Sequence, residues 1–373
     1  MPTEAPVKLI SFSIKGYKSI KELPTLEAKQ INILIGANGA GKSNLISFFK
    51  LLRTSLIPAI PFQEHIARLG GAEVLLHLGT AVTKELECTL SIDSGKGLND
   101  YYFRYGATGP KSMAYFEEKL RYSDNAHSDT KGNWIHIGKL SEVSQLSDES
   151  TKNPTAKSII FLLRQIIVYQ FHDTGENAKI RKSFGVNSGK VLHDDASNLG
   201  SFIYNMSLSD SDYFKRLVSI IQLVFPQFER FDLIPFGSQV LLCWFEKGSN
   251  YSFDASQASD GTLRFMALAA LLTQPKDKIA KIIFIDEPEL GLHPTAISVL
   301  ASLIKEASVY SQIFVSTQSP EFIDFFEPED IIVVEKDDKQ STFTRHNKEE
   351  LKSWLVDYSL GDIWKMNLIG GRP

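Results

Sequence analysis

A glycine-rich loop that ends in lysine and serine stands directly after a short apolar run. Residues 36–43 read GANGAGKS and follow INILI at 31–35. Glycine adopts backbone angles that other residues avoid, so successive peptide N–H groups can turn inward around an anion. A helix that starts where the loop ends adds the partial positive charge of its N-terminus. The pattern predicts a phosphate-binding loop.

The residues of this loop are candidate ligands of a nucleoside triphosphate. Lys42 would reach the β- and γ-phosphates, and the Ser43 hydroxyl would bind Mg²⁺. An ordinary glycine turn with an incidental lysine is the alternative, which the complete pattern between strand and helix disfavours. ATP with Mg²⁺ is the predicted ligand. The remaining residues expected around the phosphates are Gly36, Ala37, Asn38, Gly39, Ala40, Gly41 and Asn44.

A second candidate segment, KIIFIDEPELGLHP at 281–294, carries two adjacent acids after an apolar run. The run predicts a central strand that delivers its acids to the carboxyl edge of the sheet, where open α/β sheets bind ligands. Asp286 would then hold the Mg²⁺ shell, and Glu287 would act as the base toward the attacking water. Taken alone, two adjacent acids after a strand more often mark a solvated helix start. The presence of a phosphate loop in the same chain favours the functional interpretation instead.

Acids followed by proline resemble the ABC-type ATPase superfamily, and a signature helix is expected upstream. ASDGTLRFMALAALL at 258–272 offers Ser259 as a helix cap before an apolar stripe. Ser259, Asp260 and Gly261 resemble the Ser-x-Gly triplet of an LSGGQ-like signature. By this resemblance Ser259 and Gly261 present the helix start to the γ-phosphate held by a second protomer. A capped helix without a ligand is the alternative.

Further segments narrow the resemblance to the RecF/OLD-like AAA family ATPases, ABC-type heads related to the SMC and RecF proteins. The similar segments are SDGTLRF, IDEPELGLHP, STQSPEFID, LGDIWKMNLIGGRP, YQFHDTG (169–175) and GGAEVLLHLG (70–79). The resemblance implies a homodimer that closes over two nucleotides. The chain resembles a stand-alone head without a fused Toprim nuclease, since only 55 residues follow Gln318.

Two positions depart from the pattern of ABC heads. The histidine expected after the strand that follows the acid pair is replaced by Gln318, in STQSP. Unlike histidine, glutamine cannot become cationic. Because it can donate and accept hydrogen bonds, we assign Gln318 a catalytic role as the switch residue. The glutamine expected to bind Mg²⁺ after the first helix is assigned to Gln63, with a plain surface glutamine as the alternative. His172 and Asp173 are weaker candidates for the nucleotide edge or a structural pair.

These residues require strands that alternate with helices. Apolar runs predict strands at 8–20, 31–35, 71–79, 85–93, 240–245, 282–286, 312–317 and 330–335, and a helix at 44–56. Alternation of this kind predicts an α/β fold, an ABC-type P-loop ATPase head with a mostly parallel central sheet, an antiparallel β lobe and a helical signature lobe. We expect one head over 1–373, with an insertion at 93–158, the signature lobe at 159–275 and the Walker B half at 276–340. Within the insertion, 101–105 and 133–137 are candidate strands.

The bulk composition fits a cytoplasmic ATPase. The 373 residues are 43% hydrophobic and 23% charged with a net charge of −4, which gives no global basic field for nucleic acid. Cys88 and Cys243 lie in apolar stretches and are expected to be buried free thiols. We see neither a signal peptide nor an apolar run that could cross a bilayer. Lysines at 8, 15, 18 and 21 could contribute to a local DNA contact, and a solvated strand face is the alternative.

Three functions compete. We favour an ATPase whose closure acts on DNA or on a separately encoded effector nuclease, in anti-phage defence or in DNA maintenance and repair. The nucleotide-binding subunit of a membrane transporter is disfavoured because the signature and the C-terminal segment resemble the RecF/OLD group, and no membrane partner is expected. A phosphotransferase is disfavoured because it has no use for a signature helix.

Overall fold

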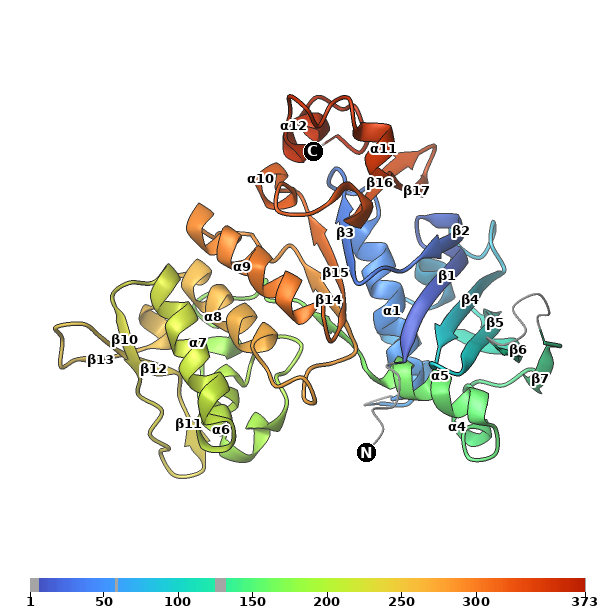
Figure 1. The fold of residues 1–373 in the computed structure, drawn as a ribbon. Coiled ribbons are helices and arrows are strands. Elements are labelled where there is room, and N and C mark those ends of the chain that lie inside the picture. Colours follow the sequence, from blue (N-terminus) through green and yellow to red (C-terminus); the bar gives the residue numbers. More distant parts are fainter. Residues whose placement is uncertain (1–6, 58–59, 125–131, 373) are drawn as a thin grey trace. The chain divides into compact units, whose positions relative to one another are not determined.

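The structure is a computed structural model that describes residues 7–57, 60–124 and 132–372. Contacts divide the chain into two units, each of which is described by itself (Figure 1). The first unit contains 1–167 and 328–373, and the second contains 168–327. The domain boundaries predicted from the sequence stay predictions.

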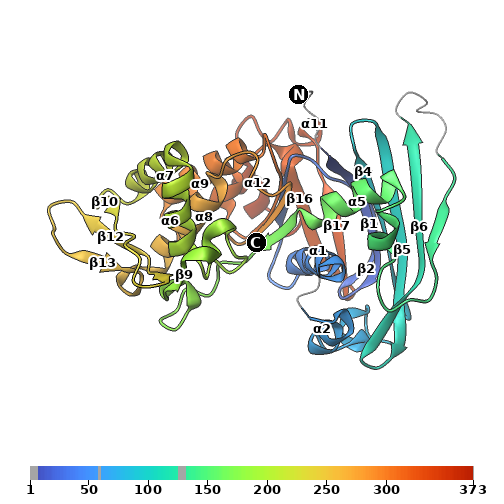
Figure 2. The same ribbon diagram turned by 90° about the horizontal axis from the view of Figure 1, so that it is seen from below.

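An antiparallel sheet fills much of the first unit, with the strand order β2-β1-β4-β5-β6-β7. Apolar residues stand at every second position of β4. Because successive side chains of a strand point to opposite faces, one face of β4 is buried. The helices α1, α2 and α5 lie against this sheet (Figure 2). The strands are β1 (Lys8–Tyr17), β2 (Ile20–Glu27), β4 (Glu85–Asp93), β5 (Gly97–Gly109), β6 (Ser112–Asp124) and β7 (Ile135–Gly138).

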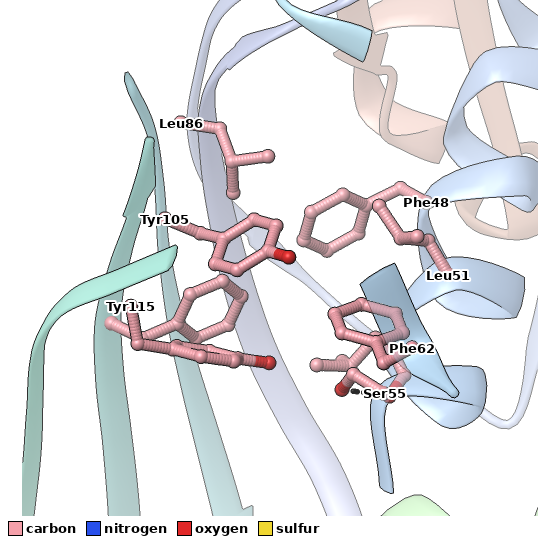
Figure 3. A pocket seen from close by; sticks show the side chains of 9 residues that line it. Phe48, Leu51, Ser55, Phe62, Leu86, Tyr105 and Tyr115 are labelled. Atoms are coloured by element: carbon pink, nitrogen blue, oxygen red, sulfur yellow. Dashed lines mark hydrogen bonds between the residues drawn. The ribbon is translucent and has the colours of Figure 1, made fainter. Parts of the chain in front are cut away.

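The helices of this unit are short except for α1 and α5. They are α1 (Lys42–Leu56), α2 (Phe62–Arg68), α3 (Ala72–Leu75), α4 (Leu146–Glu149), α5 (Pro154–Arg164), α11 (Lys348–Leu351) and α12 (Leu360–Lys365). A cavity of the size of about one water molecule lies where α1 and α2 face the sheet (Figure 3). Tyr105 and Tyr115 of the sheet approach Phe48 and Phe62 of the helices there. This apolar lining belongs to the packed core of the unit.

The first unit also contains the strand that carries the glycine loop. β3 (Ile31–Ile35) is buried along its whole length and pairs in parallel with β16 (Ile331–Asp337). On the other side of β16, β17 (Gln340–Arg345) runs antiparallel. β8 (Ile166–Tyr169) crosses the boundary between the units. A fully apolar run such as INILI suits a strand that is covered on both faces.

The second unit combines a parallel strand pair with packed helices. β14 (Ile282–Asp286) and β15 (Gln312–Thr317) pair in parallel, and Phe284 stacks on Phe314 between them. The helices α7, α8 and α9 pack together (Figure 1). The helices are α6 (Leu199–Ser209), α7 (Ser211–Val224), α8 (Asp260–Leu272), α9 (Pro294–Ala307) and α10 (Pro320–Ile323); the other strands are β9 (Phe184–Gly185), β10 (Phe228–Phe231), β11 (Gln239–Val240), β12 (Cys243–Glu246) and β13 (Ser252–Asp254).

Most predicted strands are confirmed, and two are corrected. Residues 71–79 form the short helix α3 and a turn instead of a strand, because Leu75 and Leu76 donate backbone hydrogen bonds to carbonyls four residues earlier. The run 240–245 is broken into β11 and β12, which pair with different strands. Residues 93–158 contain β5, β6, β7, α4 and the start of α5; the candidate strand 101–105 lies in β5, and the candidate strand 133–137 overlaps β7 at 135–137.

Both cysteines are free thiols: Cys88 is buried in β4, while Cys243 is only partly covered. Within the described ranges, no helix is long and apolar enough to cross a bilayer.

Candidate functional site

The glycine loop connects β3 to α1 through backbone angles that favour glycine. Gly36, Gly39 and Gly41 all have positive φ, at 147°, 78° and 119°. A Cβ on Gly36 would lie 2.1 Å from the Val334 carbonyl oxygen, and a Cβ on Gly41 would lie 2.0 Å from Ser341 Oγ. Both the angles and the space therefore demand glycine at these two positions.

Lys42 begins α1 and folds back onto the loop. Its Nζ donates to the carbonyl oxygens of Gly36 and of Ala37, the latter at 3.1 Å. The side chain is buried, whereas the next residue, Ser43, is exposed. The ammonium group is thus held against the loop, and the hydroxyl of Ser43 is accessible to a ligand.

A chain of hydrogen-bonded polar side chains connects the glycine loop to other segments of the first unit. Asn44 Nδ2 donates to Ser19 Oγ at 2.7 Å, and Ser19 Oγ lies 2.6 Å from Ser341 Oγ, which donates to the Ala40 carbonyl. The side chain of Asn44, which we predicted to bind the cofactor, is therefore engaged in this chain of hydrogen bonds. Ser19 and Ser341 were missed by the sequence analysis, because 322 residues separate them.

Gln63 in α2 has its carboxamide engaged by Met113 of β6 and by Glu142, which follows β7. Its Nε2 donates to the Met113 carbonyl at 2.5 Å and to the Glu142 carbonyl at 3.2 Å, and its Oε1 accepts from Met113 N at 3.2 Å. A metal-ligand role would require the amide to leave these partners. The geometry therefore favours a structural role for Gln63 over the predicted Mg²⁺ ligand.

In the second unit, Asp286 ends β14 within a set of hydrogen-bond donors. It accepts a hydrogen bond from Ser316 Oγ, while Gln170 Nε2 lies 3.5 Å away and His172 Nε2 lies 3.6 Å away. Burial alone would raise the pKa of Asp286, but the contacts with His172 and Ser316 outweigh burial and lower it. The same contact with Asp286 raises the pKa of His172. Asp286 is thus held as a carboxylate, the form that binds a divalent cation.

Glu287 has an unusual backbone and is paired with Gln318. Its φ is +42°, a conformation that costs about 1–2 kcal/mol in a residue with a side chain. Its N–H donates to the Ser316 carbonyl at 2.9 Å, and Gln318 Nε2 donates to its Oε1. Strain of this kind concentrates at functional sites. The predicted base and the predicted switch residue are therefore in direct contact.

Glu289 contacts the segment that carries Gln318. Its Oε1 accepts from Thr317 Oγ1 at 2.5 Å and from Gln318 N at 3.2 Å. Burial raises the pKa of Glu289. Glu289 was not predicted as a site residue, although it lies in the same motif as Glu287.

The signature helix begins as predicted from the capping pattern. Ser259 is the N-cap of α8, and its Oγ accepts from Thr262 N at 3.1 Å. Ser259 is exposed, and its hydroxyl also lies 2.8 Å from Thr262 Oγ1. A Cβ on Gly261 would lie 2.3 Å from the Gly291 carbonyl oxygen, so the helix start packs directly on the loop after β14.

Arg264 joins three segments of the second unit. It is buried in α8, and donates from Nε to the Phe171 carbonyl at 3.0 Å and from its other end to the Leu290 carbonyl. His172, next to Phe171, is the residue that touches Asp286. The signature helix is therefore tied to both segments that surround the acid pair.

Two of the four lysines considered for a DNA contact have partners of their own. Lys15 lies 3.7 Å from Glu87, and Lys18 Nζ donates to Ser47 Oγ at 3.0 Å. Burial lowers the pKa of Lys18. At these two positions the geometry favours a strand face over a DNA contact.

Comparison with known proteins places these features in a family. Residues 31–324 match the family described as "AAA domain, putative AbiEii toxin, Type IV TA system". The chain belongs to this AAA family. The match includes the glycine loop, the signature helix, the acid pair and Gln318. The predicted resemblance to OLD-like ABC-type ATPases is thereby confirmed.

A curated relative of this AAA-family chain is "Old nuclease" of Escherichia phage P2. The two are 27% identical over 353 residues, and the match covers 84% of this chain and 56% of the relative. The AAA-family chain thus spans little more than half the length of that protein.

Two solved structures share the fold of this AAA-family member. An SMC head bound to the C-terminal winged-helix domain of ScpA has a TM-score of 0.58 at 17% identity, covering 92% of this chain and 99% of the other. An SMC head with an extended coiled coil, bound to the C-terminal domain of ScpA derived from Pyrococcus furiosus, has a TM-score of 0.54 at 14% identity, with 94% and 99% coverage. These likenesses confirm the predicted fold, an α/β ABC-type ATPase head.

Proposed function

We propose that this AAA-family chain binds ATP with Mg²⁺ and hydrolyses it to ADP and phosphate. The observation that supports this most strongly is the contact between Glu287, held at positive φ, and Gln318, beside the ionised Asp286. A strained acid with a fixed hydrogen-bond partner, next to a second acid of different environment, is the arrangement expected of a catalytic base and a cation ligand.

Each half contributes a different part of the chemistry. In the first unit, the loop 36–43 would surround the phosphates, and Lys42 would neutralise charge on the β- and γ-phosphates. In the second, Glu287 would take a proton from the attacking water while Gln318 holds its carboxylate in place.

Each unit offers a candidate ligand of a magnesium ion. Ser43 of the first unit has an exposed hydroxyl, and Asp286 of the second unit has a carboxylate with a lowered pKa; hard oxygen ligands of this kind suit Mg²⁺. When bound, Mg²⁺ would neutralise negative charge on the triphosphate.

We further propose that two copies close over two nucleotides, with Ser259 of each copy facing the γ-phosphate held by the other. The exposed Ser259 at the start of a thirteen-residue helix supports this, since a helix N-terminus attracts an anion. ATP would stabilise the closed dimer by its higher affinity for that form, and hydrolysis would remove the contact.

For the biological role, we propose action on a separately encoded effector nuclease or on DNA in bacterial defence or DNA maintenance. The toxin–antitoxin description of the family and the nuclease name of the phage relative support this choice. An ATPase assay with and without linear DNA, followed by co-purification on the Glu287→Gln protein, tests it. If DNA does not stimulate the ATPase and no nuclease is among the retained proteins, this role is contradicted.

A further inference from the structure

A nearly buried arginine, Arg181, grips the turn that precedes the signature helix. Its side chain is 8% exposed, and the partners named below all belong to the second unit. Nε donates to the Thr174 carbonyl at 2.7 Å. The remaining contacts are from Nη1 to the carbonyls of Ala255 at 2.5 Å, Ser256 at 3.4 Å and Ala258 at 2.9 Å, and from Nη2 to Asp260 Oδ1 at 2.7 Å.

These contacts fix the backbone on both sides of Ser259. The short helix 255–257 ends one residue before the extended Ala258 and Ser259, and α8 starts at Asp260. Arg181 binds carbonyls before Ser259 and the carboxylate after it. A planar guanidinium with five fixed donors suits this task, because it loses little freedom for each hydrogen bond.

Arg181 also joins this turn to the surroundings of Asp286. Thr174, whose carbonyl it binds, is buried, and Thr174 N donates to the His172 carbonyl at 3.1 Å. His172 Nε2 in turn lies 3.6 Å from Asp286 Oδ2. One arginine thus connects the segment beside the acid pair with the segment that presents Ser259.

The contact with Asp260 has an electrostatic consequence. Asp260 stands between Ser259 and Gly261, and its side chain is 61% exposed. A carboxylate at that position would repel a triphosphate that approaches the helix start, since like charges in close contact are unfavourable. Arg181 pairs with this carboxylate at 2.7 Å and supplies the opposite charge.

We propose that Arg181 is a positioning residue that orients Ser259 toward the nucleotide held by the second copy and offsets the charge of Asp260. The proposal rests on the nucleotide sandwich described above. It assigns Arg181 to the partner's ATP site instead of to the site formed by its own chain's glycine loop.

The first measurement separates binding from turnover. The Arg181→Ala protein is expected to bind a non-hydrolysable ATP analogue within about twofold of the parental affinity, while kcat falls roughly tenfold or more. Loss of analogue binding together with a collapsed melting curve would mean that Arg181 only stabilises the fold. In that event Arg181→Lys, which keeps the charge but not the fork, is measured in the same way.

The second measurement tests the charge. Asp260→Asn added to Arg181→Ala is expected to recover several-fold of the lost kcat, because the uncompensated carboxylate is gone. Asp260→Asn alone is measured to complete the comparison, and Asp212→Asn, at an exposed pair with Lys215 on α7, is the matched control that should change kcat by less than about twofold. A double variant as slow as Arg181→Ala would overturn the charge part of the proposal.

The third measurement tests which nucleotide Arg181 serves. Arg181→Ala and Lys42→Ala proteins, each inactive or slow alone, are mixed so that subunits exchange. A mixed dimer then has one composite site with an intact loop and an intact signature turn, and activity should return. Ser259→Arg mixed with Lys42→Ala is the reference pair.

The reference pair distinguishes two failures. If the reference pair regains activity and the Arg181→Ala pair does not, Arg181 does not act on the partner's nucleotide, although the sandwich stands. If neither pair regains activity, the sandwich is wrong and the inference falls with it.

Discussion

The two units build their candidate sites in contrasting ways. In the first, eight consecutive residues carry the phosphate loop, and Lys42 makes its contacts with residues five and six positions away. In the second, Asp286 gathers partners from positions 170, 172 and 316. The first design is local, while the second depends on the tertiary fold. We therefore expect changes in the first unit to alter nucleotide binding and changes in the second to alter turnover.

The largest expected effect is a loss of turnover with nucleotide binding retained. Glu287→Gln keeps the shape and the backbone strain of Glu287 but removes its basicity. We expect kcat to fall by roughly 10²–10⁴-fold, the usual contribution of a general base. Nucleotide affinity, measured by calorimetry, should stay within about twofold, and ATP should shift the protein to a dimer in size-exclusion chromatography.

Glu289→Gln is the matched control for this variant. The buried carboxyl of Glu289 accepts hydrogen bonds from Thr317 and Gln318, and an amide oxygen can accept the same bonds. Its kcat should change by less than about tenfold. A Glu287→Gln protein that releases phosphate at the parental rate would remove Glu287 from the mechanism.

The next effect breaks binding. Lys42→Ala removes an ammonium held at the loop, and a hydrogen bond to a charged group contributes about 1.5–3 kcal/mol, or roughly 10–100-fold in affinity. Calorimetric titration with ATP measures this loss directly. Lys50→Ala, at an exposed position of the same helix, should bind as the parent does. Equal affinities for the Lys42→Ala and parental proteins would contradict the assignment of the loop.

The contrast between the units also explains what the sequence could predict. GANGAGKS and IIFIDE are contiguous, and their strand and helix context is written in neighbouring residues, so β3, α1 and β14 were all expected. Ser259 was found because a helix cap has a local pattern. The fold class followed from the alternation of strands and helices.

Residues whose partners lie far away in the sequence could not be predicted from local patterns. Nothing in the local pattern around Ser19 shows that it meets Ser341, and nothing around Arg181 shows that it binds the turn at 255–260. The helix α3 was mistaken for a strand because the run LL suggested burial, whereas hydrogen bonds to Gly71 and Ala72 decided its conformation. Tertiary partners thus explain the missed residues, whereas local backbone hydrogen bonds gave the wrongly predicted element its helical form.

Smaller effects should distinguish the two kinds of glycine. Gly36→Ala combines a positive φ with a Cβ 2.1 Å from a backbone oxygen, and we expect a loss of about 2–4 kcal/mol. Gly261→Ala, on a helix, meets the Gly291 oxygen at 2.3 Å without positive φ, and about 1–3 kcal/mol is expected. Chemical denaturation measures both. Gly175→Ala, with nothing within 4 Å of the added Cβ, is the control and should be neutral.

The smallest effect concerns Gln63, where the predicted metal role and the observed contacts disagree. Gln63→Leu removes the hydrogen bonds to Met113 and Glu142 and leaves the Met113 N–H without its acceptor, at a cost of about 1–3 kcal/mol. We expect a lower melting temperature with an unchanged Mg²⁺ concentration for half-maximal ATPase activity. Gln63→Glu separates the two roles further, because a carboxylate would bind Mg²⁺ at least as well but cannot donate to the Met113 carbonyl. A Glu variant that melts early with unaltered Mg²⁺ dependence supports the structural role, whereas a Leu variant that needs more Mg²⁺ would restore the metal-ligand assignment.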